Sequence, residues 1–352
     1  MSLNNACSLS FATVHSENDH EDNTTNLNLA LDRYKDMLTT CPKDKGWVNE
    51  DLYIYKGFWH FNFLWGVFSL EAMMTLQHTF QAQPTDIYLI TLPKSGTTWI
   101  KALAYAIVNR ERYKNNTLSS HPLLTYNPHK CVPFLETEFF GKTSVYTDGC
   151  LPRLLATHIP YSSLPQSILD SGCRIVYMCR NPKDVLVSLF HFSNKLRDKS
   201  RCRMAFDEAF EMFRKGVMPY GPYWDHVKAY YNFSLEHPNN ILFLTYEDMK
   251  ENTVNKVKLL AEFLGCAFTK EEEARGVVDE IVRLCSFENL SEVNKHGDFR
   301  EGVPNDVFFR EGKVGDWRSH LTDEMTKVLN QITTEKFHGL DISFEVGSLE
   351  RN

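Results

Sequence analysis

The sequence has no long run of basic residues, and its formal net charge is −7 at pH 7. A protein that binds nucleic acid non-specifically usually presents a strongly basic face, so this charge balance argues against that class. Long hydrophobic runs are missing too. The most apolar stretch, residues 57–70, is shorter than the roughly 20 residues that span a bilayer, and His60 and Asn62 interrupt it. We therefore expect neither a nucleic acid nor a membrane as partner.

The nine cysteines form no Cys-x-x-Cys pair, and no histidines stand beside them at zinc-ligand spacing. Free thiols in a reducing compartment explain this pattern best, so we expect a cytoplasmic protein without a bound metal. The first residues lack the charged-then-apolar pattern of a secretory signal. Residues 1–28 carry four acidic side chains and no Lys or Arg, which predicts a disordered polar tail rather than an organellar transit peptide.

A short apolar run, followed by a sharp loop and a stretch with helical spacing of apolar residues, occurs three times. The runs are residues 87–90, 175–178 and 241–244. Alternation of short apolar runs with helices predicts a parallel sheet covered on both faces. Such sheets bind ligands at the carboxyl ends of their strands. We therefore expect one α/β domain with a central parallel sheet flanked by helices.

Further elements follow from local patterns. Thr269 with Glu272 three residues later is a capping-box pattern, which predicts a helix that continues to Cys285. Apolar residues at helical spacing predict another helix over 325–332. Residues 294–309 are polar and contain Gly and Pro, which indicates a mobile flap.

Residues 92–99 read Leu-Pro-Lys-Ser-Gly-Thr-Thr-Trp and join the first apolar run to a helix. The N–H groups of a helix's first turn and the helix dipole bind anions, and Lys94 adds a positive charge. An ordinary strand–helix turn with a surface lysine would look similar. The Walker A spacing is missing because Lys94 precedes Gly96, and no Walker B carboxylate is evident. The loop therefore indicates a phosphate-like anion without metal-dependent triphosphate chemistry.

Three segments together resemble the cytosolic sulfotransferase family, in the family's order and at its separations. Residues 91–99 (TLPKSGTTW) are similar to its 5′-phosphosulfate loop, and residues 179–192 (CRNPKDVLVSLFHF) to its 3′-phosphate segment. Residues 308–322 (FFREGKVGDWRSHLT) are similar to its C-terminal signature. Residues 153–165 (RLLATHIPYSSLP) look closest to the plant branch, whose members act on flavonols, brassinosteroids, hydroxyjasmonate or desulfoglucosinolates.

The resemblance implies an enzyme that transfers a sulfuryl group from 3′-phosphoadenosine-5′-phosphosulfate (PAPS) to a hydroxyl of a small acceptor, without a metal. It also implies a fold like that of the P-loop nucleotide hydrolases, with a sulfotransferase domain over residues 84–346. Residues 29–83 would form an N-terminal helical and aromatic segment that contributes to the acceptor site. A flavonoid or other phenol is the first expectation for the acceptor, with a brassinosteroid, hydroxyjasmonate or desulfoglucosinolate as alternatives.

By the same resemblance, His158 is the general base and Lys94 also takes part in catalysis. A histidine with a pKa near neutrality can accept the proton of the acceptor hydroxyl. For two residues a purely structural role stays open: Arg180 could form an ion pair with Asp184, and Tyr246 could be a buried tyrosine with one hydrogen bond. The residues expected to bind PAPS are Lys94, Ser95, Gly96, Thr97, Thr98, Trp99, Arg180, Ser188, Tyr246, Ser286, Arg310, Glu311 and Gly312.

Aromatic side chains are expected to form the acceptor site, because their flat faces suit a phenolic or fused-ring molecule. Simple core packing would explain each of them equally well when it is taken alone. The candidates are Phe58, Trp59, Phe61, Phe63, Tyr161 and Phe192.

One departure from the family pattern lies in the C-terminal signature, where Glu311 replaces the usual lysine. A negative charge beside the 3′-phosphate should weaken donor binding unless its side chain points away, and Lys313 would compensate in part. A nucleotide-binding module without turnover is therefore an alternative function. A metal-dependent kinase is another rival, and a Golgi carbohydrate sulfotransferase a third, although the latter are membrane-anchored and no segment here suits an anchor.

We predict a monomer. Many animal members of the family carry a short dimer motif directly after the Gly-Asp-Trp signature, in the pattern Lys, three residues, Thr-Val, three residues, Glu. Here Arg318, Thr322, Asp323 and Lys327 stand at those positions, so an apolar residue is lost and a charge is reversed. A self-complementary contact of this kind depends on both. Sedimentation at micromolar protein should give the monomer mass, and a dimer mass would contradict the prediction.

Overall fold

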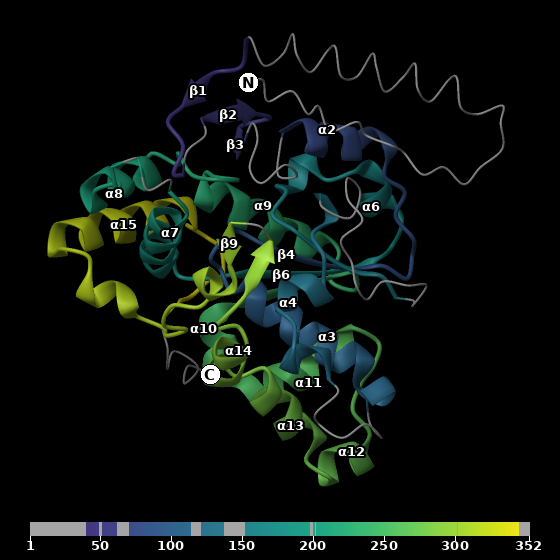
Figure 1. Ribbon diagram of the computed structural model, residues 1–352. Coiled ribbons are helices and arrows are strands. Elements are labelled where there is room, and N and C mark those ends of the chain that lie inside the picture. The colour runs from purple at the N-terminus through teal and green to yellow at the C-terminus, as the bar shows by residue number, and fades with distance from the viewer. Residues whose placement is uncertain are drawn as a thin grey trace, which may run out of the picture. The chain divides into compact units, whose positions relative to one another are not determined.

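A four-stranded parallel sheet forms the centre of the protein in the computed structural model (Figure 1). The structure describes residues 40–48, 51–61, 70–113, 121–136, 152–197, 200, 202–300 and 302–344. The three predicted runs are strands β4, β6 and β7, which confirms the expected parallel sheet. A fourth strand, β5, is one that the sequence pattern did not single out. In sheet order the strands are β5 (Leu154–Thr157), β4 (Ile87–Thr91), β6 (Arg174–Cys179) and β7 (Ile241–Thr245).

The strand pairing brings four carboxyl ends to one edge. Thr157 lies opposite Ile90 at the end of β4, and Cys179 pairs with Thr245 in register. Every residue of β4 is buried, as expected for a strand with helices on both faces. The loops that leave these strands therefore converge, although they are far apart in the sequence.

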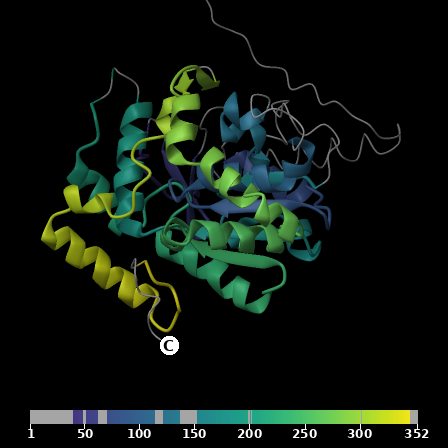
Figure 2. The ribbon, with the colours of Figure 1, turned by 90° about the horizontal axis from the view of Figure 1, so that it is seen from below.

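Helices cover both faces of the sheet (Figures 1 and 2). On one face α3 (Thr97–Tyr113) packs against α11 (Thr253–Phe263) and α13 (Val277–Leu284). On the other face lies α9 (Tyr223–Glu236), whose Tyr230 ring stacks on Tyr177 of β6. A third group consists of α7 (Pro182–Leu196), α8 (Phe206–Arg214) and α15 (Asp323–Lys336). Helix α15 contacts both of the others.

The aromatic segment before the sheet is partly a strand, which corrects the expected helix. Strands β1 (Lys43–Asp44), β2 (Leu52–Tyr55) and β3 (Phe58–Phe61) form an antiparallel sheet. The two-residue turn between β2 and β3 has positive φ at both positions, 49° at Lys56 and 84° at Gly57, which is the type I′ geometry favoured in hairpins. Helix α2 (Leu70–Thr79) follows. Residues 1–28 and 62–69, with Phe63, lie outside the described residues.

One helix prediction needs correction. The capping box of Thr269 and Glu272 is present, but the helix ends after one turn as α12 (Lys270–Ala274), because Gly276 adopts a left-handed φ of 77° before α13 begins. The segment predicted as a flap contains the hairpin β8–β9 (Asp298–Arg300 and Val303–Pro304), followed by a 3₁₀ turn at Asn305–Phe308.

The predicted C-terminal helix is confirmed as α15. The short helices not yet given are α4 (Pro128–Cys131), α6 (Gln166–Asp170), α10 (Tyr246–Glu251) and α14 (Phe287–Val293), with 3₁₀ turns at Pro122–Leu124, Tyr161–Ser163 and Asp316–Ser319. Within the part of the chain that the structure describes, no helix is both long and apolar enough to cross a membrane.

Candidate active site

The loop between β4 and α3 lies at the carboxyl edge of the sheet. Gly96 has a φ of +100°, and a Cβ there would approach the Met178 side chain to 2.6 Å and Tyr246 to 2.8 Å. Only glycine fits this turn without a shift of its neighbours. The first N–H groups of α3, at Thr97 and Thr98, have no acceptor within the helix, as at any helix start. They are therefore able to donate to an anion at this end of the helix.

Lys94 adds a positive charge to this loop. Its backbone has a φ of 68°, and its Nζ lies 4.1 Å from the centre of the Phe192 ring. Burial is the main cause that lowers the pKa of Lys94 to about 7, and the positive charges of Arg180 and Arg310 act in the same direction. An anion bound between these side chains would favour the charged form of the amine and raise this pKa again.

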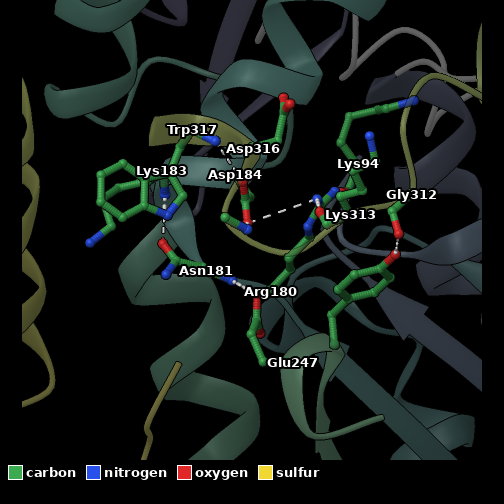
Figure 3. Close-up of polar contacts among 12 residues, drawn as sticks. Lys94, Arg180, Asn181, Lys183, Asp184, Glu247, Gly312, Lys313, Asp316 and Trp317 are labelled. Atoms are coloured by element: carbon green, nitrogen blue, oxygen red, sulfur yellow. Dashed lines mark hydrogen bonds and ion pairs between the residues drawn. The ribbon is translucent and has the colours of Figure 1, made fainter. Parts of the chain in front are cut away.

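Arg180 follows β6 directly and is held mainly by carbonyl oxygens. Its guanidinium donates to the carbonyls of Lys313 at 2.7 Å and Lys94 at 3.4 Å (Figure 3). It also lies over the Tyr246 ring, 4.6 Å from the ring centre. The ion pair with Asp184 exists but is long, at 3.9 Å. The structural ion pair and the predicted anion contact are thus compatible, because carbonyl partners orient Arg180 without neutralising it.

The Asp184 carboxylate connects α7 to the C-terminal segment. It is fully buried and accepts hydrogen bonds from the backbone N–H groups of Gly315 at 2.8 Å and Trp317 at 3.0 Å. Lys183, the preceding residue, lies over the Trp317 ring at 4.3 Å (Figure 3). These contacts bring the Arg-Glu-Gly segment next to the loop after β6, as the resemblance requires.

Tyr246 and its neighbours form an aromatic corner of the site. Its hydroxyl donates to the carbonyl of Gly312 at 3.0 Å, so the hydrogen bond expected for a purely structural tyrosine is present. Its ring meets Trp99 edge-on at 5.4 Å between centres. Ser286 caps α14 by accepting from the N–H of Asn289 at 3.2 Å. Trp99, Tyr246 and Ser286 all line the same cavity.

The charges of the Arg-Glu-Gly segment are partly paired. Arg310 contacts Asp316 at 2.6 Å, whereas Glu311 contacts Lys313 at 3.1 Å. The Glu311 side chain is 42% exposed. Lys313 therefore compensates the charge of Glu311, as the sequence suggested, and Glu311 is not a buried negative charge.

Most of the predicted site residues line a cavity of about 270 Å³. Ser95 does not line it; its hydroxyl is buried and has no hydrogen-bond partner among the described residues. The predicted residues that line the cavity are Phe61, Lys94, Gly96, Thr97, Thr98, Trp99, His158, Arg180, Ser188, Phe192, Tyr246, Ser286, Arg310, Glu311 and Gly312.

His158 follows β5 and is held in one tautomer. Its Nδ1 lies 2.6 Å from the carbonyl oxygen of Thr91. A carbonyl only accepts, so Nδ1 carries the hydrogen and Nε2 keeps a free lone pair. Burial lowers the pKa of His158 to about 3, against the effect of this hydrogen bond, so the ring is neutral at physiological pH. The carbonyl of His158 accepts from His226 at 3.1 Å, and His226 in turn contacts the Tyr177 hydroxyl at 2.9 Å.

Three predicted acceptor residues do not line this cavity. Phe58 packs edge-on against His226, with 6.0 Å between ring centres. Trp59 is the next residue of β3, and its backbone N–H donates to the carbonyl of Gly221 at 2.8 Å. Tyr161 packs on Phe233 at 4.3 Å. Of the three, Phe58 is buried and shows the core-packing alternative, whereas Trp59 and Tyr161 are partly exposed.

Sequence reasoning missed several aromatic residues that line the cavity. They come from four separate segments. Only Phe308 stands in a quoted motif, at the start of residues 308–322, and for the others proximity in the fold is the only signal. These residues are His129, Phe134, Tyr220, Phe299 and Phe308.

Unpaired donors indicate what the cavity could hold. The buried Nε atoms of Arg180 and Arg310 have no partner among the described residues. Together with Lys94, they fit a ligand that carries several negative charges, as PAPS does. No group of three or more His, Cys, Asp or Glu side chains is arranged to hold a metal ion in the described ranges.

Comparison with known proteins gives a family. The profile described as "Sulfotransferase domain" matches residues 84–341. Cytosolic sulfotransferase 12 of Arabidopsis thaliana is 42% identical over 311 residues, which cover 88% of this chain and 93% of the relative. Flavonol 4′-sulfotransferase of Flaveria chlorifolia is 44% identical over 301 residues, covering 84% of this chain and 91% of the relative.

Solved structures show the same fold. An Arabidopsis thaliana protein provisionally named a steroid sulphotransferase has a TM-score of 0.68 at 38% identity, covering 88% of this chain and 94% of that one. A mouse sulfotransferase complexed with PAP, the product left by PAPS, has a TM-score of 0.60 at 26% identity, covering 82% of this chain and 94% of that one.

The pKa of Lys94 predicts how PAP binding depends on pH. We expect Lys94 to bind the phosphates as a charged amine, so above pH 7 binding should take up a proton and the dissociation constant (Kd) should rise by up to about tenfold per pH unit. Calorimetric titration with PAP between pH 7 and 9 measures this. Lys94→Arg keeps its charge and is the matched control, whose Kd should stay nearly constant. An equal pH slope in both proteins would contradict the prediction.

Proposed function

The chain belongs to the sulfotransferase family and is a PAPS-dependent sulfotransferase, and we propose that its acceptor is a flavonoid or another small phenol. The observation that carries this proposal is the cavity itself: a neutral His158 and a cationic loop share it with the aromatic side chains of Phe61, Phe134 and Phe308. Aromatic walls favour flat ring systems. The likeness to a flavonol sulfotransferase supports the same class of acceptor.

We assign the general base to His158. Its Nε2 lone pair would accept the proton of the acceptor hydroxyl as the acceptor oxygen forms its bond to sulfur. The bond between sulfur and the 5′-phosphate oxygen breaks at the same time, and the oxygen leaves with the electron pair. The negative charge of bound PAPS counteracts the burial that lowers the pKa of His158, which makes the ring a better base when the donor is in place.

Lys94 and the first turn of α3 would stabilise the leaving group. Negative charge builds up on the phosphate oxygen in the transition state, and positioned cations and N–H groups stabilise it without further rearrangement. Arg180, Ser188 and the segment from Arg310 to Gly312 would bind the 3′-phosphate, while Tyr246 and Trp99 would flank the adenine. In this assignment the protein supplies all the positive charge that the transfer needs.

We also propose that the protein acts in the cytosol as a monomer. The relatives named cytosolic sulfotransferases support the location. The positions of the animal dimer motif open α15 here: Thr322 caps the helix by accepting from the N–H of Met325, and Asp323 is its first residue. Both therefore have local roles at a helix start.

The acceptor and the base can be tested together. Sulfuryl transfer from PAPS to flavonols, hydroxysteroids, hydroxyjasmonate and desulfoglucosinolates should be measured in excess chelator. We expect turnover on a flavonol, and a loss of about 10² to 10⁴ in kcat for His158→Ala. His338→Ala, which changes an exposed histidine outside the cavity, is the control and should retain full activity.

Any other result would change one of these assignments. Turnover on another acceptor class replaces the flavonoid proposal, and full activity of His158→Ala removes His158 as base. Loss of activity in chelator would favour a metal-dependent reaction. PAP binding without turnover on any acceptor would support the binding module.

The departure at Glu311 also predicts a measurable effect. Because Glu311 lines the cavity but is paired and partly exposed, its charge should weaken PAP binding only modestly. Glu311→Lys should lower the Kd for PAP by about two- to fivefold, the size expected for exposed charges. Glu311→Gln separates removal of the negative charge from addition of a positive one. An unchanged Kd in Glu311→Lys would show that the side chain does not act on the donor.

A further inference from the structure

A lysine with no place in the roles assigned above lies buried behind the cavity wall. Lys101, on α3, has no exposed surface. It forms no ion pair with a carboxylate of the described residues, although Glu136 is near enough to favour the charged form. Its Nζ instead lies 3.3 Å above the centre of the Phe134 ring and 3.0 Å from Nδ1 of His129. A buried amine needs such partners, because an unpaired one is costly.

His129 connects this lysine to the cavity. It sits on α4, where its backbone N–H donates to the side chain of Asn127 at 2.9 Å. Its Nδ1 faces Lys101, and its Nε2 lies 3.1 Å from the hydroxyl of Thr98. Thr98 and Lys101 are three residues apart and lie on the same side of α3, so one imidazole ring bridges them. His129 and Thr98 line the cavity, whereas Lys101 does not.

A positive charge on Lys101 would fix the direction of this chain of hydrogen bonds, whereas a neutral amine could either donate or accept. A charged ammonium only donates, so Nδ1 of His129 must accept and Nε2 must carry the hydrogen. Nε2 then donates to the oxygen of Thr98, and the hydrogen of the Thr98 hydroxyl points elsewhere. If Lys101 were neutral and accepted from Nδ1, the Thr98 hydroxyl would donate to Nε2 and turn its lone pairs outward. Only the first arrangement offers a donor to an anion.

We propose that Lys101 and His129 are positioning residues that direct the hydroxyl hydrogen of Thr98 toward an anionic oxygen of PAPS. The inference rests on the proposed donor site, in which the first turn of α3 binds the 5′-phosphosulfate. Through these hydrogen bonds the buried charge of Lys101 sets the orientation of the Thr98 hydroxyl that faces PAPS. The hydroxyl keeps its proton throughout.

Burial and nearby charges act in opposite directions on the charged form of Lys101. Burial lowers the pKa of Lys101, against the effect of Glu136 and Cys131. Burial also lowers the pKa of His129, and the charge of Lys101 lowers it further. The pair therefore holds at most one positive charge. A bound polyanion favours the state in which Lys101 carries it.

A double-mutant cycle tests the proposal. Calorimetry should give the Kd for PAP of wild type, Thr98→Val, Lys101→Met and the double variant. Hydrogen bonds to charged groups are strong, so we expect Thr98→Val to weaken binding about tenfold or more, and Lys101→Met somewhat less. The double variant should bind about as weakly as Thr98→Val alone, because both changes remove the same hydrogen bond. A lysine with a purely structural role would give effects that multiply.

His129→Phe keeps a ring of similar shape, removes both nitrogens and decides the matter if Lys101→Met does not fold. Its Kd should match that of Thr98→Val. Lys130→Met is the matched control: Lys130 neighbours His129 but donates to the carbonyl of Asp298, and its Kd should stay within twofold of wild type.

Wild-type affinity in Lys101→Met, or in His129→Phe where the first variant is unfolded, would overturn the proposal, as would multiplied losses in the double variant. Failure of the wild type to bind PAP would instead overturn the donor site on which the proposal rests.

Discussion

The buried carboxylate of Asp184 is the contact on which the anion site depends. Its two oxygens accept the N–H groups of Gly315 and Trp317, which lie 131 and 133 residues further along the chain. This holds the C-terminal segment against the loop after β6, where Arg180 donates to the carbonyl of Lys313. The hydrogen bond from Tyr246 to the Gly312 carbonyl and the contact of Lys183 with Trp317 support the same attachment. The proposed 3′-phosphate site is therefore a tertiary feature, although each half is recognisable in the sequence.

Carbonyl oxygens are the nearest partners of Arg180, whereas Arg310 is paired with the Asp316 carboxylate. A carboxylate within about 3 Å would orient Arg180 equally well but would cancel most of its charge. The carbonyls of Lys94 and Lys313 orient the guanidinium and leave that charge available. Burial and the positive charges of Arg180 and Arg310 lower the pKa of Lys94 to about 7. A bound anion would offset the repulsion among these cations, and its binding should stabilise the folded protein.

Much of this arrangement was predictable because local constraints mark it. The runs that became β4, β6 and β7 are short, apolar and followed by loops, and Gly96 is required by a turn that only glycine fits. Where the prediction failed, the deciding contact was not local. The split between α12 and α13 depends on one left-handed residue, Gly276, and the hairpin at Lys56 and Gly57 has a turn signal that the surrounding aromatic residues concealed.

The acceptor side of the site was harder to predict for a related reason. Aromatic residues are equally suited to a core and to a pocket wall, and only the fold decides between them. Phe58 packs inside and Tyr161 packs on Phe233, partly exposed, while Phe61 and Phe192 line the cavity. Nothing in the sequence separates the two groups, because their neighbours in space come from α9, α7 and the C-terminal segment.

The same limit explains why Lys101 escapes sequence reasoning and why its position matters. A lysine that projected into an aromatic cavity would bring water with it and would compete with a flat acceptor for space. Behind Phe134, the amine is removed from water, and its hydrogen bond goes to His129. An imidazole can accept at one nitrogen and donate at the other, so it transmits the orientation set by the charge. The wall facing the acceptor stays aromatic, while the wall facing the donor gains a directed hydroxyl. An aromatic wall for the acceptor and a directed hydroxyl for PAPS can coexist only if the charge lies behind the wall. A charge on the cavity surface would disturb the aromatic face that the acceptor contacts.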